Sequence, residues 1–392
     1  MSFLETLASE RLRSWPIIED VDKQAVVASM DEDLTGHRNR SLLELERRFA
    51  EFSGADYCLG FNGGTAAIHA ALFACGVRAG DEVIVPAFSF SGTFMPILAL
   101  GATPVFVDIE PDTFNINPGL IWPAITQLTK AIIPVHIHGL MADMDGVRIA
   151  AGTTISIVED ACQAHGASFG AEPAGTIGDA GCFSLNHTKT LPGGEGGLLI
   201  TNSSDIRTEA NKFRIFGEDL TRIDPKVGRT YECQSMGLNY LLPGMSAALA
   251  NSQLKRFEQY ANRARLNGLM LDKVLGDSEF IAPQATPKGS RHTYHKYRLR
   301  IAPQIDRDEL IKRLRMRGVP CGLWQVTPMP LYPLFSNRHA PEQYPETIKL
   351  LNESIIVGSE KYPLCAQDSE VAYYMAEVVK AEAKRLWRKG VK

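Results

Sequence analysis

The chain has 392 residues, of which 45% are hydrophobic and 22% charged, as in an ordinary globular enzyme. This length allows about two to three domain-sized units. A net charge of −4 and a pI near 6.2 argue against nucleic acid or an anionic membrane as the main partner. The cysteines are scattered, no apolar run could span a membrane, and no signal pattern opens the chain. We therefore expect a soluble cytoplasmic protein.

The first elements end in a glycine-rich turn. Residues 1–40 are mixed and charged, and we expect them to form an arm. Apolar residues at helical spacing predict a helix over 41–52, which ends at Gly54. After a short strand over 57–60, the run 62–73 predicts a glycine-rich turn that opens a helix of small residues. The free N–H groups at such a helix start attract phosphate, although helix starts without ligands are commoner.

Short runs rich in β-branched residues then alternate with helical or loop stretches. Several of these runs are apolar on both faces, which is typical of central strands in a mostly parallel sheet covered by helices. Ligands of such sheets lie beyond the carboxyl ends of the strands. The expected strands are 82–85, 104–107, 131–135, 156–158, 182–185 and 197–201. The residues just past their ends are Phe88, Phe90, His136, His138, Asp160 and Lys189.

The pattern changes near residue 255. We expect one long charged helix over 253–275 to connect two domains. Beyond it, residues 297–301 alternate like a strand, 306–317 predict an amphipathic helix, and 371–388 predict a closing helix. The predicted organisation is an α/β large domain over 1–255, including the arm 1–40, and a smaller α+β domain over 256–392.

One lysine stands out among these features. Lys189 follows the apolar run that begins at Cys182, and Gly193, Gly194, Gly196 and Gly197 come soon after it. The glycines leave room for a bulky planar group to reach the amine. An amine that meets an aldehyde forms a Schiff base, the linkage by which proteins hold pyridoxal phosphate. A solvated turn lysine is the structural alternative.

An acid is placed to complement such a ring. Asp160 ends the strand that includes residues 156–158, where a carboxylate suits contact with a cationic ring nitrogen. Gln163 is then a candidate for a hydrogen bond to the ring oxygen, and Phe90 for stacking on the ring face. Taken singly, each of these three residues is equally compatible with a structural role, as a helix cap, a helix residue or a core residue.

Three runs in this order and spacing form a specific pattern. They are Val158-Glu-Asp-Ala-Cys-Gln-Ala-His-Gly-Ala167, Phe183-Ser through Thr188-Lys189, and Gly194-Glu-Gly-Gly197. With Gly64, Thr65 and Phe90 they resemble the DegT/DnrJ/EryC1/StrS aminotransferase family. The resemblance extends from about Arg38 to the C-terminal helix.

The resemblance implies a pyridoxal-phosphate enzyme of fold type I that acts as a homodimer with sites shared between the subunits. Lys189 would hold the cofactor as a Schiff base and transfer the proton during the reaction. Asp160 would bind the pyridine nitrogen. The phosphate would be held by Gly64, Thr65 and Ser184, and by Asn239 from the partner subunit.

The same resemblance narrows the reaction without naming the substrate. Family members that act as sugar dehydratases have histidine where this chain has Lys189, so transamination is favoured. We expect the amino group of glutamate or glutamine to be transferred to a keto-sugar, with a nucleotide-linked sugar as the main candidate and a cyclitol ketone as the alternative. Two departures from the family pattern concern the substrate: Leu241 replaces a common arginine, and Trp324-Gln325 replace a histidine–aromatic pair. Trp324, Gln325 and His187 are the candidate substrate contacts.

Other classes of site are less consistent with the sequence. His136 and His138 are spaced to share one side of a strand, but no acid or cysteine set completes a metal site, so no metal is expected. A Rossmann oxidoreductase needs Gly-x-Gly-x-x-Gly, which residues 60–65 do not supply. A silent binding protein of the same fold has no need of both Lys189 and Asp160.

Overall fold

The computed structural model describes residues 11–32, 39–219, 231–324, 327–336 and 338–390. Its largest feature is a seven-stranded sheet with the order β1-β9-β8-β5-β4-β2-β3. Only β9 runs antiparallel to its neighbours, so the predicted mostly parallel sheet is confirmed. The strands are β1 (Tyr57–Phe61), β2 (Glu82–Pro86), β3 (Thr103–Val107), β4 (Thr129–Ile132), β5 (Ser156–Asp160), β8 (Ala180–Ser184) and β9 (Gly197–Thr201).

Helices cover both faces of this sheet, because successive strand residues point to opposite sides. Val83 and Val85 of β2 pack into one core with α4, α5 and α8, whereas Ile84 packs into the other with α3 and α7. Burial on both faces explains why these strands are apolar throughout. The helices are α3 (Arg40–Ser53), α4 (Gly64–Ala74), α5 (Met95–Ala99), α6 (Ile121–Ala124), α7 (Met144–Ala151) and α8 (Ser204–Phe213).

Two expectations about these elements were wrong. The strand expected over 131–135 ends at Ile132, since Pro134 follows and lacks the N–H that a ladder needs. The helix expected over 253–275 is two helices, α9 (Gly244–Leu254) and α10 (Phe257–Leu275). The chain breaks at Arg256, whose φ of −110° and ψ of 1° leave the helical region.

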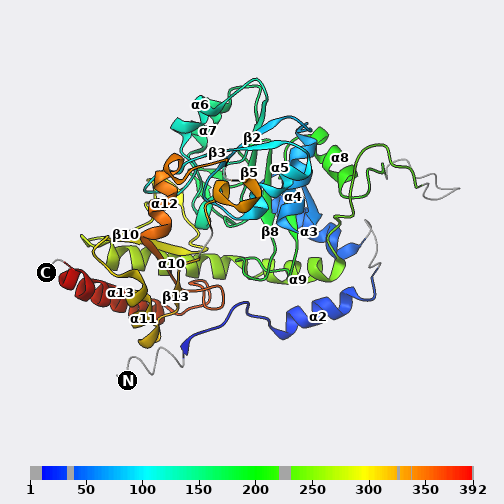
Figure 1. The fold of residues 1–392 in the computed structure, drawn as a ribbon. Coiled ribbons are helices and arrows are strands. Elements are labelled where there is room, and N and C mark those ends of the chain that lie inside the picture. Colours follow the sequence, from blue (N-terminus) through cyan, green and yellow to red (C-terminus); the bar gives the residue numbers. More distant parts are fainter. Residues whose placement is uncertain (1–10, 33–38, 220–230, 325–326, 337, 391–392) are drawn as a thin grey trace.

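The arm also has a regular element. Helix α2 (Asp20–Ser29) packs along α9 below the sheet (Figure 1). Its buried Asp22 accepts hydrogen bonds from Arg256 at 2.6 Å and from Gln253 at 2.9 Å. The arm is therefore attached by a charged, buried contact at the very point where α9 and α10 separate.

The C-terminal part forms a second core around a four-stranded antiparallel sheet with the order β10-β12-β14-β13. The strand predicted over 297–301, the helix over 306–317 and the closing helix are all present. A three-stranded sheet, β11-β6-β7, links the two parts. The boundary at residue 255 stays a prediction. The elements are β6 (Ser168–Phe169), β7 (Glu172–Pro173), β10 (Ile281–Pro283), β11 (Ser290–Arg291), β12 (Tyr297–Ile301), β13 (Cys321–Gly322), β14 (Ser354–Val357), α11 (Arg307–Met316), α12 (Pro345–Asn352) and α13 (Ser369–Gly390).

Among the described residues, no helix combines the length and the apolar character needed to cross a bilayer.

Candidate active site

One cavity of about 460 Å³ lies where β5 and β8 end and α4 begins. We call it the cofactor pocket. It collects residues from widely separated parts of the chain, as expected at the carboxyl edge of such a sheet. The predicted site residues that line it are Gly64, Thr65, Phe90, Asp160, Gln163, Ser184, His187, Lys189 and Trp324.

Two predicted residues are not placed there. Asn239 does not line the cavity of its own chain; it is exposed, and its carbonyl accepts a hydrogen bond of 3.3 Å from Asn62. Its contribution to a partner's site stays a prediction. Gln325 lies outside the described residues.

Lys189 is held by its backbone on a tightly bonded loop between β8 and β9. The loop folds on itself through hydrogen bonds from Lys189 N to the Asn186 carbonyl at 2.9 Å and from His187 N to the Gly194 carbonyl at 2.8 Å. Trp15 of the arm donates its indole N–H to the Lys189 carbonyl at 3.1 Å. The backbone of this lysine is thus fixed from two sides, which leaves its side chain to the cavity that it lines.

Asp160 is the last residue of β5, and both its carboxylate oxygens are engaged. Oδ2 accepts a hydrogen bond of 2.7 Å from the Thr93 hydroxyl, and Oδ1 accepts one of 3.2 Å from the Cys162 N–H. Ser89 bonds the same threonine at 2.8 Å. These hydrogen bonds fix the position of the Asp160 carboxyl group, which lines the pocket.

The start of α4 provides a positive charge. The first N–H groups of a helix have no partner within it and carry its partial positive charge. Gly64 is needed there for space: a Cβ at this position would meet Cys162 Sγ at 2.8 Å and Ser184 Cβ at 3.1 Å. The close approach of α4 to the end of β8 brings the Thr65 and Ser184 hydroxyls to one anion-binding corner.

Gln163 and two histidines form the wall behind Asp160. The Gln163 Oε1 accepts a hydrogen bond of 3.0 Å from the His138 N–H, so its amide N–H₂ is oriented as a donor. Burial lowers the pKa of His165 to about 3, and the nearby Lys189 charge adds to this effect. His165 is accordingly neutral at physiological pH.

The alternative of a metal pair at His136 and His138 is not supported by their surroundings. His136 bonds Glu159 at 2.8 Å through Nε2 and accepts from the Ala142 N–H through Nδ1, so both its nitrogens are used within the fold. His138 Nε2 accepts from Arg298 at 3.1 Å. In the part of the chain that the structure describes, no three His, Cys, Asp or Glu side chains gather as a metal ion would need.

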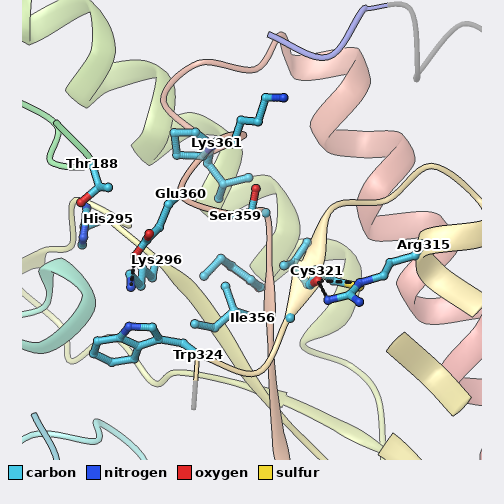
Figure 2. Close-up of a pocket in the computed structure, with 16 residues that line it drawn as sticks. Thr188, His295, Lys296, Arg315, Cys321, Trp324, Ile356, Ser359, Glu360 and Lys361 are labelled. Carbon is cyan, nitrogen blue, oxygen red and sulfur yellow. Dashed lines mark hydrogen bonds and ion pairs between the residues drawn. The ribbon is translucent and has the colours of Figure 1, made fainter. Parts of the chain in front are cut away.

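The sequence analysis missed Lys296 and Glu360, which also line this pocket. Lys296, just before β12, lines the cofactor pocket together with Trp324 and Glu360. Its ammonium lies 3.8 Å from the centre of the Trp324 ring and 3.3 Å from Glu360 Oε1 (Figure 2). The only hint of it in the sequence is a lysine next to an alternating strand, a position at which most lysines are solvated.

These residues meet the needs of pyridoxal 5′-phosphate. The cavity volume is within the range of about 300–1,000 Å³ usual for cofactor sites. A lysine lines it, a fixed carboxylate matches a pyridinium nitrogen, and a helix start with adjacent hydroxyls matches a phosphate. Phe90 is 56% exposed at this cavity, so its ring has a free face for stacking.

Comparisons with known proteins agree with this assignment. The model of the DegT/DnrJ/EryC1/StrS aminotransferase family matches residues 16–369. L-glutamine:2-deoxy-scyllo-inosose aminotransferase of Streptomyces fradiae is 38% identical over 65% of this chain and 61% of its own length, which is less than two thirds. GDP-perosamine synthase of Caulobacter vibrioides is 32% identical over 78% of this chain and 81% of its own. A Streptococcus pneumoniae protein solved in its PLP form superposes with a TM-score of 0.85 at 25% identity, covering 95% and 98% of the two chains.

The fold and the pocket define a pyridoxal-phosphate-dependent enzyme of fold type I. Within that class, the chain belongs to the DegT/DnrJ/EryC1/StrS aminotransferase family. The predicted fold class, cofactor and family are thereby confirmed.

Proposed function

We propose that this protein transfers the amino group of glutamine or glutamate to the ring ketone of a sugar, with a nucleotide-linked sugar as the main candidate. The observation that carries the proposal is the placement of Lys189 and Asp160 in one cavity at the start of α4. When bound, pyridoxal phosphate supplies an electron sink that stabilises negative charge on the substrate carbon.

The residues around the cofactor have separate tasks in this proposal. Lys189 binds the cofactor, and its Nζ then holds the proton that leaves the donor's α-carbon. Asp160 keeps the ring nitrogen protonated, and Thr93 keeps Asp160 in place. The donor leaves as a 2-oxo acid before the ketone enters, so two half-reactions and ping-pong kinetics follow.

The remaining predicted contacts fit the same scheme. Gly64, Thr65 and Ser184 hold the phosphate, and Gln163 donates to the ring oxygen. Phe90 stacks on the ring. His187 and Trp324, which also line the pocket, contact the substrate.

We propose further that the enzyme is a cytoplasmic homodimer in which Asn239 reaches the partner's phosphate site. The exposed position of Asn239 supports this. Exposed apolar side chains on the arm, on α9 and close to Asn239 in the sequence support it as well; they are Met30, Met245, Phe216 and Met236. All seven cysteines are free, which agrees with a reducing compartment.

A cyclitol ketone is the second candidate acceptor. Its support comes from the S. fradiae relative named above and from Leu241, which stands where many family members have an arginine. A ring ketone without a nucleotide needs no arginine to bind a diphosphate. Dehydration of a sugar is the least supported reaction, because Lys189 is retained.

An absorption spectrum of the purified holoenzyme tests the proposal. We expect a visible band that moves to shorter wavelength when glutamine or glutamate is added, and the better donor is the one that shifts it faster. The ketones GDP-4-keto-6-deoxymannose and 2-deoxy-scyllo-inosose are then added separately, and recovery of the visible band identifies the acceptor class. A band that neither amino acid changes would contradict the proposal.

A further inference from the structure

Lys296 lies between two cavities. Besides the cofactor pocket, it lines a neighbouring chamber of about 420 Å³ formed mostly by apolar residues of the small sheet, including Tyr297, Ile356 and Leu364. Thr188, Trp324 and Glu360 also belong to both cavities. Figure 2 shows the Lys296 side chain between the Trp324 ring and the Glu360 carboxylate. This lysine therefore stands at the junction of the two spaces, with only 10% of its side chain exposed.

A cation in this position is costly. The pKa of Lys296 is lowered to about 7, chiefly by burial and also by the charges of Lys189 and Arg298, whereas Glu360 raises it. The bond to Glu360 is 3.3 Å, longer than the 2.7–2.9 Å usual for charge-assisted hydrogen bonds, and the Glu360 side chain is 57% exposed. An ammonium has three N–H donors, so this one bond leaves it with capacity for another anion.

The cofactor does not need the spare N–H donors of Lys296. Its ring nitrogen is matched by Asp160 and its phosphate by the start of α4, so the free positive charge on the described wall of the pocket is that of Lys296. Of the two substrates in the proposed function, the amino-acid donor always carries a carboxylate. That carboxylate sits on the same carbon as the amine that must reach the cofactor next to Lys189. Both lysines line one pocket, so a donor placed for reaction has its carboxylate close to Lys296.

We propose that Lys296 binds the α-carboxylate of the amino-acid donor, while Trp324 and Glu360 hold the Lys296 ammonium in place. This inference rests on the proposed function, because it assumes an amino-acid donor. The Trp324 ring stabilises the ammonium by a cation–π contact without competing for the carboxylate, since the ring face offers no hydrogen-bond donor.

The test uses two analogues of glutamine, one that lacks the α-amine and one that lacks the α-carboxylate. Glutaramate is glutamine without the α-amine: it keeps the carboxylate and cannot react. 4-Aminobutanamide is glutamine without the carboxylate. Binding of both compounds to the holoenzyme is measured by calorimetry, for the wild type and for Lys296→Met, which removes the ammonium and keeps an unbranched side chain one atom shorter. We expect the variant to bind glutaramate about 10–100-fold more weakly, the effect of losing a hydrogen bond to a charged group. Binding of 4-aminobutanamide should change less than about twofold.

Two further variants sharpen the test. Lys361→Met removes the same charge from an exposed lysine that lines the chamber but not the cofactor pocket, so it should leave glutaramate binding unchanged. Lys296→Arg keeps the charge and should restore most of the affinity that Lys296→Met loses. In kinetics, Lys296→Met should raise the donor KM by a similar factor and leave the KM of the ketone within about twofold.

Equal glutaramate affinities in the wild type and in both methionine variants would overturn the assignment of Lys296. So would an equal loss in Lys296→Met and Lys361→Met. Failure of the proposed function gives a different result: neither glutamine nor glutamate then converts the wild-type holoenzyme. The glutaramate comparison still decides the role of Lys296 in that case, because it requires no reaction. If Lys296→Met does not fold, Lys296→Gln replaces it in the same series.

Discussion

The two walls of the cofactor pocket are built differently. On the wall from the large sheet, the polar groups are bonded to one another: Asp160 is held by Thr93 and the Cys162 N–H, and Gln163 by the His138 N–H. On the wall from the small sheet, Lys296 has one long bond to an exposed carboxylate. Asp160 and Gln163 are thus held by bonds within the fold, whereas Lys296 is held by a single long bond.

The difference indicates a division of labour. A group that stays bound throughout the reaction benefits from a site that is rigid before binding, since no reorganisation is then needed. Two chemically different substrates that bind in turn need polar groups whose hydrogen bonds are completed only by the ligand. In the proposed function, the large sheet is accordingly the cofactor side, and the small sheet is the side that would distinguish the substrates.

The largest expected effect comes from removing the amine on the cofactor side. Lys189→Ala should reduce turnover at least about 10³-fold, near the upper end for loss of a proton-transfer group. The visible band of the lysine-bound cofactor should disappear. The melting temperature should stay close to that of the wild type, because the loop is held by backbone bonds. Turnover at the wild-type rate would remove Lys189 from the mechanism.

A smaller effect is expected from the ring-nitrogen partner. Asp160→Asn should slow the proton-transfer step by about 10²-fold, since a neutral amide no longer holds the ring nitrogen in its protonated form. Thr93→Val removes the hydrogen bond to Asp160 and keeps the carboxylate, so its rate should fall by about tenfold or less. Single-turnover rates with glutamine measure both. Equal rates in the two variants would show that position, and not charge, is what Asp160 provides.

The substrate side should respond to pH where the cofactor side does not. Lys296 must be protonated to bind a carboxylate, and burial sets its pKa at about 7 despite the opposing effect of Glu360. Wild-type affinity for glutaramate should be constant below pH 7 and fall up to about tenfold per unit above it. The charged groups that act on the ammonium, Glu360, Lys189 and Arg298, are the same in Lys296→Arg, whose affinity should stay flat to pH 9. A wild-type profile as flat as that of the arginine variant would contradict the assignment.

The smallest expected effect is on stability. The pKa of Lys296 is about 7 in the fold and about 10.4 in an unfolded chain. The unfolded state therefore binds more protons between these values, and the cost of burying the ammonium is full below pH 7 and vanishes toward pH 10. Lys296→Met should melt about 2–5 °C above the wild type at pH 6.5, with the gap closing at higher pH. Calorimetric scans at pH 6.5 and 9.5 check this; a variant that melts lower at both would mean that the lysine stabilises the fold.

The sequence predicted residues that the structure brings to one cavity, because these residues lie in short local runs. Lys189 stands beside its glycines, and Asp160 and Gln163 follow one strand, so strand, turn and chemistry are read from neighbouring positions. The same reasoning missed Thr93, although Ser89 and Thr93 follow the end of β2 in the manner of site residues. The expected single helix over 253–275 is broken at Arg256, whose side chain bonds Asp22 of the arm, a contact that the residues around Arg256 do not reveal.

The substrate side could not be predicted in this way. Lys296 and Glu360 are far apart in the sequence, and both are far from Lys189. Only the docking of the small sheet against the large one brings them to the pocket. Charged residues of β12 contact aromatic rings from other segments there: Arg298 lies 5.4 Å from the Phe88 ring, and Arg300 lies 5.5 Å from the Phe114 ring. Such contacts leave no periodic pattern in either segment.

The hydrogen bond from Trp15 to the Lys189 carbonyl has a consequence for how the enzyme matures. Trp15 packs against Tyr260 and Cys365, and its backbone N–H donates a hydrogen bond of 2.9 Å to the Lys361 carbonyl. Trp15 is synthesised early, but it can make these contacts only after nearly the whole chain has been synthesised. The loop that carries the cofactor lysine gains its second support at that late moment, so a nascent chain can form the large sheet well before it has a finished catalytic centre.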